Sequence, residues 1–104
     1  DLAEAHGARW NAIAANVKAD ARIGGSHLMP VHQHTHLSAN PGRGAGGHCL
    51  IKDFAAFREL FEKVLAHDKE SIAVLRALET KNIKLLKESG KDLDLLAGVY
   101  GDDV

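Results

Sequence analysis

The sequence predicts an all-α fold, in which short helices surround a long glycine- and histidine-rich loop and an antiparallel helical hairpin follows. Two observations predict the helices and the loop. Apolar residues recur at three- and four-residue steps in residues 8–19, 53–66 and 69–89, as in amphipathic helices. Residues 20–52 instead carry glycine, proline and histidine without periodicity. A link of two to three residues between the last two patterns favours an antiparallel pair.

The first helical pattern covers residues 1–19. We expect Gly7 to end a short first piece, because glycine is a weak helix former. The second piece then follows one apolar stripe, made of Trp10, Ile13, Ala14 and Val17. Trp10 is interpreted as a core or interface aromatic residue.

The predicted hairpin covers residues 53–66 and 69–89. Asp53 and Asp68 are favoured N-cap residues, and Ser89-Gly90 is a typical C-terminal stop. We expect the apolar stripe of the first helix to form core: Phe54, Phe57, Leu60, Phe61, Val64 and Leu65. A short helical turn over residues 92–96 and a frayed end from residue 98 complete the prediction.

Size and composition indicate a single helical domain or a fragment of a longer protein. The 104 residues include 13 basic and 14 acidic side chains, so the charge balance favours neither nucleic acid nor an anionic membrane as a partner. No apolar run approaches the roughly 18 residues of a membrane span. The single cysteine cannot form an internal disulfide, which makes a reducing cytoplasm the expected location. The chain also begins inside a helical pattern without an initiator methionine, as a fragment would.

The densest cluster of unusual residues is residues 40–53, which hold four glycines and the only cysteine. A glycine-rich loop that opens into a helix can cradle an anion, because its free N–H groups and the helix dipole favour negative charge. Cys49, next to His48 and near Lys52, is a possible nucleophile. The alternative is a plain connector with a small buried thiol.

These residues carry a resemblance to a known family. The block Gly-Gly-x-Cys-x-x-Lys-Asp is matched by Gly46-Gly47-His48-Cys49-Leu50-Ile51-Lys52-Asp53. Upstream, Asp20-Ala21-Arg22-Ile23-Gly24 resembles Asp-x-Arg-Ile-Gly. Both blocks, in this order, are similar to those of the UDP-glucose/GDP-mannose dehydrogenases, the nucleotide-sugar dehydrogenase family. In that family's terms, residues 1–52 would be the second half of the central domain with the substrate loop, and residues 53–104 a helical hairpin and tail.

The resemblance implies an NAD-dependent enzyme that oxidises a sugar C6 alcohol to a carboxylate in two hydride transfers. Cys49 would be the nucleophile that forms a thiohemiacetal and then a thioester, and Asp53 would position the hydrolytic water. Lys52 would lie near NAD. The resemblance also implies a homodimer, and substrate-binding roles for Arg22, Asn40, Gly42 and Gly46. No Gly-x-Gly-x-x-Gly follows a strand pattern, so we expect NAD to be bound mainly by a domain outside this chain, which alone should be inactive.

The histidines His32, His34 and His36 depart from the family pattern. In an extended segment they share one face, with His32 and His36 about 13 Å apart. Three readings stay open: a polar loop, a metal site completed by other ligands, or an insertion that contacts substrate. A helical dimerisation domain, in which the glycine loop is only a connector, is a further alternative for the whole chain.

Overall fold

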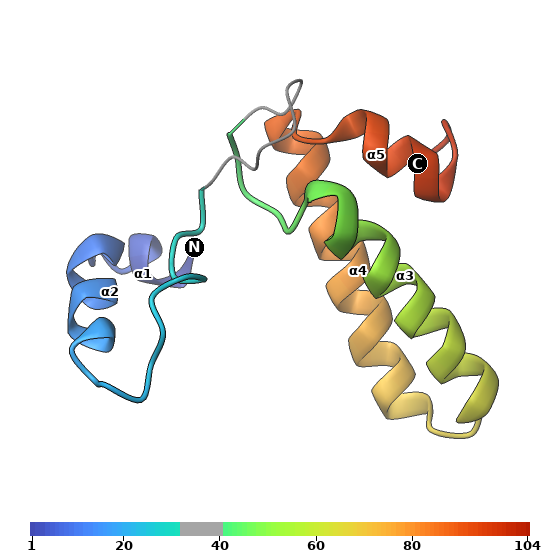
Figure 1. The fold of residues 1–104 in the computed structure, drawn as a ribbon, viewed down its shortest axis with the longest axis horizontal. Helices are drawn as coiled ribbons and strands as arrows, with labels where there is room; N and C mark the ends of the chain where they lie inside the picture. Colours follow the sequence, from blue (N-terminus) through green and yellow to red (C-terminus); the bar gives the residue numbers. More distant parts are fainter. Residues whose placement is uncertain (32–40) are drawn as a thin grey trace. The chain divides into compact units, whose positions relative to one another are not determined.

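The chain forms five helices in a computed structural model that describes residues 1–31 and 41–104. In these ranges the helices are α1 (Leu2–Ala5), α2 (Trp10–Lys18), α3 (Gly47–Val64), α4 (Lys69–Ser89) and α5 (Leu93–Tyr100), with no β-strand (Figure 1). The predicted all-α class is therefore confirmed. Two compact units, Asp1–Pro30 and Val31–Val104, divide the chain, and each is described by itself. None of the described helices combines the length and the apolar character needed to cross a membrane.

The first unit contains α1 and α2, as the helical pattern over residues 1–19 predicts. Gly7 separates the two helices with a left-handed φ of +75°. Ala14 is the buried residue of α2. The indole N–H of Trp10 donates a hydrogen bond of 2.5 Å to the carbonyl oxygen of Leu28, which ties the segment after α2 back to the start of that helix.

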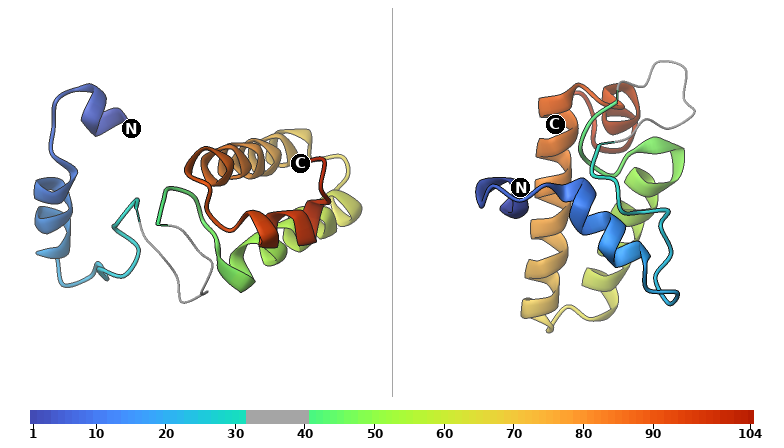
Figure 2. Two further views of the ribbon diagram at one scale, coloured as in Figure 1. Left: turned by 90° about the horizontal axis from the view of Figure 1, so that it is seen from above. Right: turned by 90° about the vertical axis from the view of Figure 1, so that its left-hand side faces the viewer.

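In the second unit, α3 and α4 form the predicted antiparallel hairpin (Figures 1 and 2). The Asp68 carboxylate caps α4, because it accepts from the Ser71 backbone N–H at 3.1 Å and from the Ser71 hydroxyl at 2.8 Å. Gly90 ends the helix in a left-handed conformation, with φ of +64°. Both predicted ends of this helix are therefore confirmed. The guanidinium of Arg76 on α4 also pairs with Glu62 on α3 at 2.5 Å.

The core of the second unit lies where α5 packs against α3 and α4, at the end where α3 begins and α4 ends (Figure 1). One buried residue from each helix forms its centre: Ile51, Leu86 and Leu96. The predicted core stripe of residues 53–66 is wrong for Phe57, Leu60, Val64 and Leu65, which are all exposed. The reason is that α4 and α5 cover the neighbouring stripe, so that α3 buries Ile51 and Ala55.

Two predicted boundaries of the second unit are also wrong. Asp53 does not cap a helix, because α3 begins at Gly47 and has Gly46 as its N-cap. The predicted loop over residues 20–52 therefore ends before Gly47. The end from residue 98 is not frayed, since α5 continues to Tyr100. Both Tyr100 and Val104 pack against the core, which holds this end of the chain in place.

Candidate functional site

Cys49 lies in the first turn of α3 and is exposed. This exposure differs from the buried thiol of the connector alternative. The first turn of a helix carries the positive end of the helix dipole, which favours negative charge on nearby groups. The Cys49 sulfur atom is therefore exposed and lies at the end of α3 where the helix dipole is positive.

Lys52 and Asp53 lie one turn further along α3, at the spacings that share a helix face with Cys49. Their side chains form an exposed ion pair of 2.7 Å between Lys52 Nζ and Asp53 Oδ1. The hydrogen bond to Asp53 and then its charge raise the pKa of Lys52, with a smaller contribution from Cys49. The structure thus gathers three predicted site residues on one helix face.

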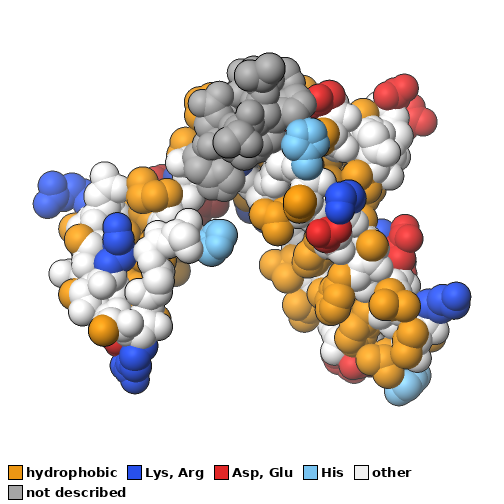
Figure 3. All heavy atoms as spheres, viewed as in Figure 1, with side chains coloured by type: hydrophobic (Ala, Val, Ile, Leu, Met, Phe, Trp, Pro, Cys, Tyr) orange, Lys and Arg blue, Asp and Glu red, His pale blue; other side chains and the backbone are white. Residues whose placement is uncertain are grey.

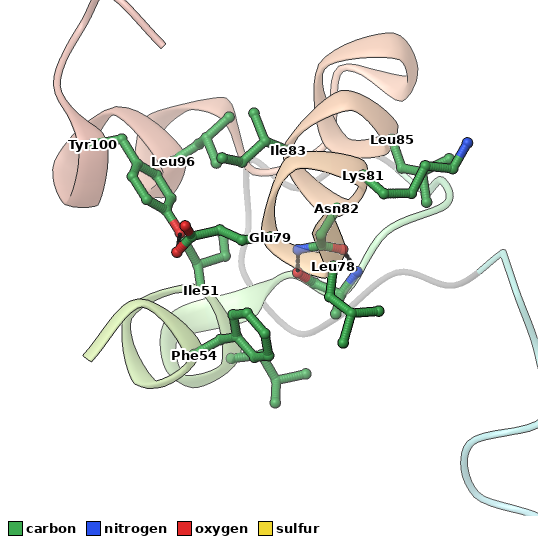
Figure 4. A pocket seen from close by; sticks show the side chains of 12 residues that line it. Ile51, Phe54, Leu78, Glu79, Lys81, Asn82, Ile83, Leu85, Leu96 and Tyr100 are labelled. Atoms are coloured by element: carbon green, nitrogen blue, oxygen red, sulfur yellow. Dashed lines mark hydrogen bonds between the residues drawn. The ribbon is translucent and has the colours of Figure 1, made fainter. Parts of the chain in front are cut away.

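The loop before Cys49 is bound by side chains from α4 and from the segment after it. Asn82 makes two hydrogen bonds with Ala45, accepting from its N–H at 2.6 Å and donating to its carbonyl oxygen at 2.8 Å (Figure 4). The Ser89 hydroxyl, which donates to the Leu85 carbonyl oxygen of its own helix at 2.7 Å, also contacts the carbonyl oxygen of Arg43 at 3.1 Å. Backbone groups of the loop are therefore hydrogen-bonded to side chains of the same chain.

Lys91 and Asp92 bind the same loop from the corner between α4 and α5. The buried Lys91 ammonium donates to the carbonyl oxygens of Gly44 at 2.8 Å and Gly42 at 3.4 Å. Burial lowers the pKa of Lys91, and the charge of Asp92 opposes that shift. Asp92 Oδ2 accepts from the Gly47 N–H at 2.8 Å. The chain's own carboxylate thus occupies an anion-binding N–H at the start of α3.

The predicted substrate-binding glycines, Gly42 and Gly46, are both buried in this contact. A Cβ on Gly46 would collide with the Asp92 carboxylate, and a Cβ on Gly42 would collide with the Ser89 side chain. Glycine is needed at both positions because the loop backbone approaches the α4–α5 corner closely. Their contact with a substrate stays a prediction.

Arg22 belongs to the first unit, and its side chain is 88% exposed. Its guanidinium pairs with Asp20 at 2.7 Å, and Asp20 also accepts from the backbone N–H of Arg22 at 2.9 Å. The side-chain hydrogen bond, followed by the backbone one, lowers the pKa of Asp20. The Asp-x-Arg block therefore forms a local turn that holds a guanidinium out from the surface.

Four predicted positions lie outside the described residues: Asn40, His32, His34 and His36. The metal reading of the three histidines stays a prediction for that reason. Within residues 1–31 and 41–104, no group of three or more His, Cys, Asp or Glu side chains is arranged to hold a metal ion.

An apolar pocket of about 320 Å³ opens between α3, α4 and α5 (Figure 4). Ala45 and Leu50, which flank the start of α3, line one part of it. Glu79 lies in the wall, where its carboxylate accepts from the Tyr100 hydroxyl at 2.7 Å and from Arg58 Nε at 3.0 Å. Burial, and then the hydrogen bond to Glu79, raise the pKa of Tyr100.

Sequence reasoning missed the residues that organise this region. Asn82 and Lys91 were given no functional role, and Asp92 was predicted only as the start of the short helical turn over residues 92–96. A charged pair directly after the glycine that ends a helix was the available signal. Nothing in the sequence linked that pair to the glycine loop nearly fifty residues earlier.

No family model, curated protein or solved structure matches this chain. The proposal below is therefore supported by the motif and by the geometry around Cys49.

Proposed function

We propose that this chain is part of an NAD-dependent nucleotide-sugar 6-dehydrogenase and supplies the thiol of its active site. The observation that carries the proposal is the exposure of Cys49 in the first turn of α3, with Lys52 and Asp53 on the same face. A nucleophilic thiol must be accessible, and reactive thiols lie near basic groups or helix N-termini. Cys49 is exposed in the first turn of α3, and Lys52 lies on the same helix face.

In the proposed reaction, the Cys49 thiolate adds to the C6 aldehyde of the sugar and forms a carbon–sulfur bond as a thiohemiacetal. Water later cleaves the corresponding thioester, which releases the carboxylate and returns the thiol. Asp53 is proposed to orient that water. NAD, held by another part of the parent protein, would supply the oxidising chemistry of the two steps. Arg22, Asn40, Gly42 and Gly46 are proposed to contact the nucleotide sugar, and Lys52 to lie near the cofactor.

The described residues do not fit NAD as a complete binding site. A dinucleotide fold begins with a strand, a glycine-rich turn and a helix, and residues 1–31 and 41–104 include no strand. The proposal therefore assigns cofactor binding to another part of a longer parent protein. The 104-residue chain alone is expected to be inactive.

The test is Cys49→Ser in the full-length parent protein. The variant should lose carboxylate formation, because serine is a much weaker nucleophile at neutral pH, and should keep nucleotide-sugar binding by calorimetry. Lys63→Ala, an exposed change in the last turn of α3, is the matched control and should keep both. Normal carboxylate formation by the serine variant would overturn the role of Cys49.

A second candidate function, homodimerisation, is favoured by the apolar surface of the hairpin. Figure 3 shows hydrophobic side chains gathered along it. Six residues of α3 and α4 are each more than half exposed: Leu50, Phe57, Leu60, Val64, Val74 and Leu78. Exposed apolar side chains that gather on one surface are typical of protein–protein interaction sites. Pairing two copies of the chain through this surface would remove these side chains from water.

Light scattering over a range of concentrations tests the dimer. The wild-type chain should shift from monomer to dimer mass, and Phe57→Ser combined with Leu78→Ser should stay monomeric. The matched control, Lys63→Ser, changes an exposed polar residue and should keep the dimer. A wild-type chain that stays monomeric at high concentration would exclude this interface.

A further inference from the structure

The six residues from Gly42 to Gly47 are held by a segment that follows them much later in the chain. Side chains of α4 and the α4–α5 corner make all of the hydrogen bonds described above for this loop. The four that do so are Asn82, Ser89, Lys91 and Asp92. The path of the backbone into α3 is therefore set by the distant corner.

Asp92 acts at the downstream end of the loop. A helix leaves its first four N–H groups without intrahelical partners, and the N-cap, Gly46, has no side chain to satisfy them. The Asp92 carboxylate accepts from one of these groups, the N–H of Gly47, and both residues are buried. Loss of that acceptor would leave a buried donor unsatisfied, two residues before Cys49.

Lys91 acts at the upstream end, through the carbonyl oxygens of Gly42 and Gly44. Its side chain has no exposed surface, so its ammonium is committed to the interior. Asp92, the next residue, is the one non-glycine residue with a positive φ in the described part of the chain, at +53°. Such strained conformations persist where the surroundings fix them, and they cluster at functional sites.

We propose that Asp92 and Lys91 are positioning residues for Cys49: they hold the glycine loop and the first turn of α3, and so present the thiol from an ordered helix. The inference rests on the proposed role of Cys49 as a nucleophile. Its test measures order and thiol reactivity in the 104-residue chain, without turnover.

The first experiment compares Asp92→Ala, Asp92→Asn and the control Asp94→Ala, which changes an exposed acid on α5. Hydrogen exchange of peptides over residues 44–50 should rise at least about tenfold in Asp92→Ala, since a hydrogen bond to a charged group is lost. Peptides over residues 72–82 of α4 should keep wild-type exchange. Asp92→Asn should recover most of the protection, because an amide oxygen can still accept from Gly47.

The second readout is alkylation of Cys49 by iodoacetamide, as the ratio of rates in the folded and unfolded chain. This ratio should move toward one in Asp92→Ala and stay close to wild type in Asp92→Asn and Asp94→Ala. If Asp92→Ala does not fold, Lys91→Met provides the same test. It keeps the side-chain length, removes the donors to Gly42 and Gly44, and should raise exchange in residues 42–46.

A uniform rise in exchange across α3 and α4, or an unchanged alkylation ratio in both Asp92→Ala and Lys91→Met, would overturn the inference. These outcomes are separable from failure of the proposed function. If the parent enzyme stays active with Cys49→Ser, the proposed role of Cys49 as nucleophile is wrong, but the hydrogen-exchange results still stand. If Cys49→Ser abolishes activity while Asp92→Ala leaves hydrogen exchange unchanged, the role of Cys49 stands and the positioning role of Asp92 is wrong.

Discussion

The Tyr100→Phe substitution tests how α5 is attached to the hairpin. The Tyr100 hydroxyl donates to Glu79, whose side chain is only 12% exposed and also pairs with Arg58. A hydrogen bond to a charged group contributes about 1.5–3 kcal/mol. Because Arg58 stays in place, Glu79 does not become an unpaired charge. We therefore expect a loss at the low end of that range, about 1.5 kcal/mol, in the free energy of unfolding.

Urea denaturation followed by far-UV circular dichroism measures this loss. Trp10 belongs to the other unit, so its fluorescence does not report on the contact. The pH dependence adds a second check. The pKa of Tyr100 is raised in the folded chain, so the stabilisation is complete below the unfolded value of about 10 and is lost as the pH rises above it.

The phenylalanine variant lacks this ionisation, and all other titrating groups are shared. The stability difference between wild type and Tyr100→Phe should therefore narrow as the pH rises from about 9 to about 11. A difference that is near zero at neutral pH, or that stays constant over this range, would refute the attachment of α5 through the Glu79 contact.

Three further substitutions have expected outcomes in the same denaturation assay. Gly44→Ala should destabilise the chain by about 2 kcal/mol, because φ is +107° and the new Cβ would lie 2.9 Å from Leu86 Cδ2. Gly98→Ala, the matched helical control with open space around it, should stabilise α5 by about 0.5–1 kcal/mol. Asp68→Ala should lower the free energy of unfolding at neutral pH, because it removes the α4 cap. Hydrogen bonds from Ser71 lower the pKa of Asp68 in the folded chain. The stability difference between wild type and Asp68→Ala should therefore disappear as the pH falls through that lowered pKa.

Local signals predicted the helices that depend on local chemistry. Asp68 caps α4 and Gly90 ends it as expected, because both act through neighbours within a few residues. The same logic failed for α3. Asp53 has the chemistry of a cap, but the helix begins at Gly47, where the acceptor is Asp92 from the far end of the chain. Periodicity found the apolar stripes of α3 but could not say which stripe α4 and α5 cover.

The candidate site was predictable only as a motif. The spacing of Cys49, Lys52 and Asp53 was enough to place them on one face once the helix included them. The buried positions of Gly42 and Gly46 were not predictable, because they depend on Ser89 and Asp92, which lie far away in the sequence. Composition had suggested a loop open to anions, whereas the described loop backbone is largely engaged by the protein's own side chains.

The long sequence separation between the glycine loop and the corner that binds it has a consequence for folding order. The α3–α4 hairpin closes across a turn of a few residues, so its formation is entropically inexpensive. The contact between Gly47 and Asp92 closes a much longer segment, and slow steps are associated with such distant pairings. The thiol-bearing turn should therefore acquire its native contacts after the hairpin has formed, together with α5, whose Leu96 packs against Ile51 across an equally long segment.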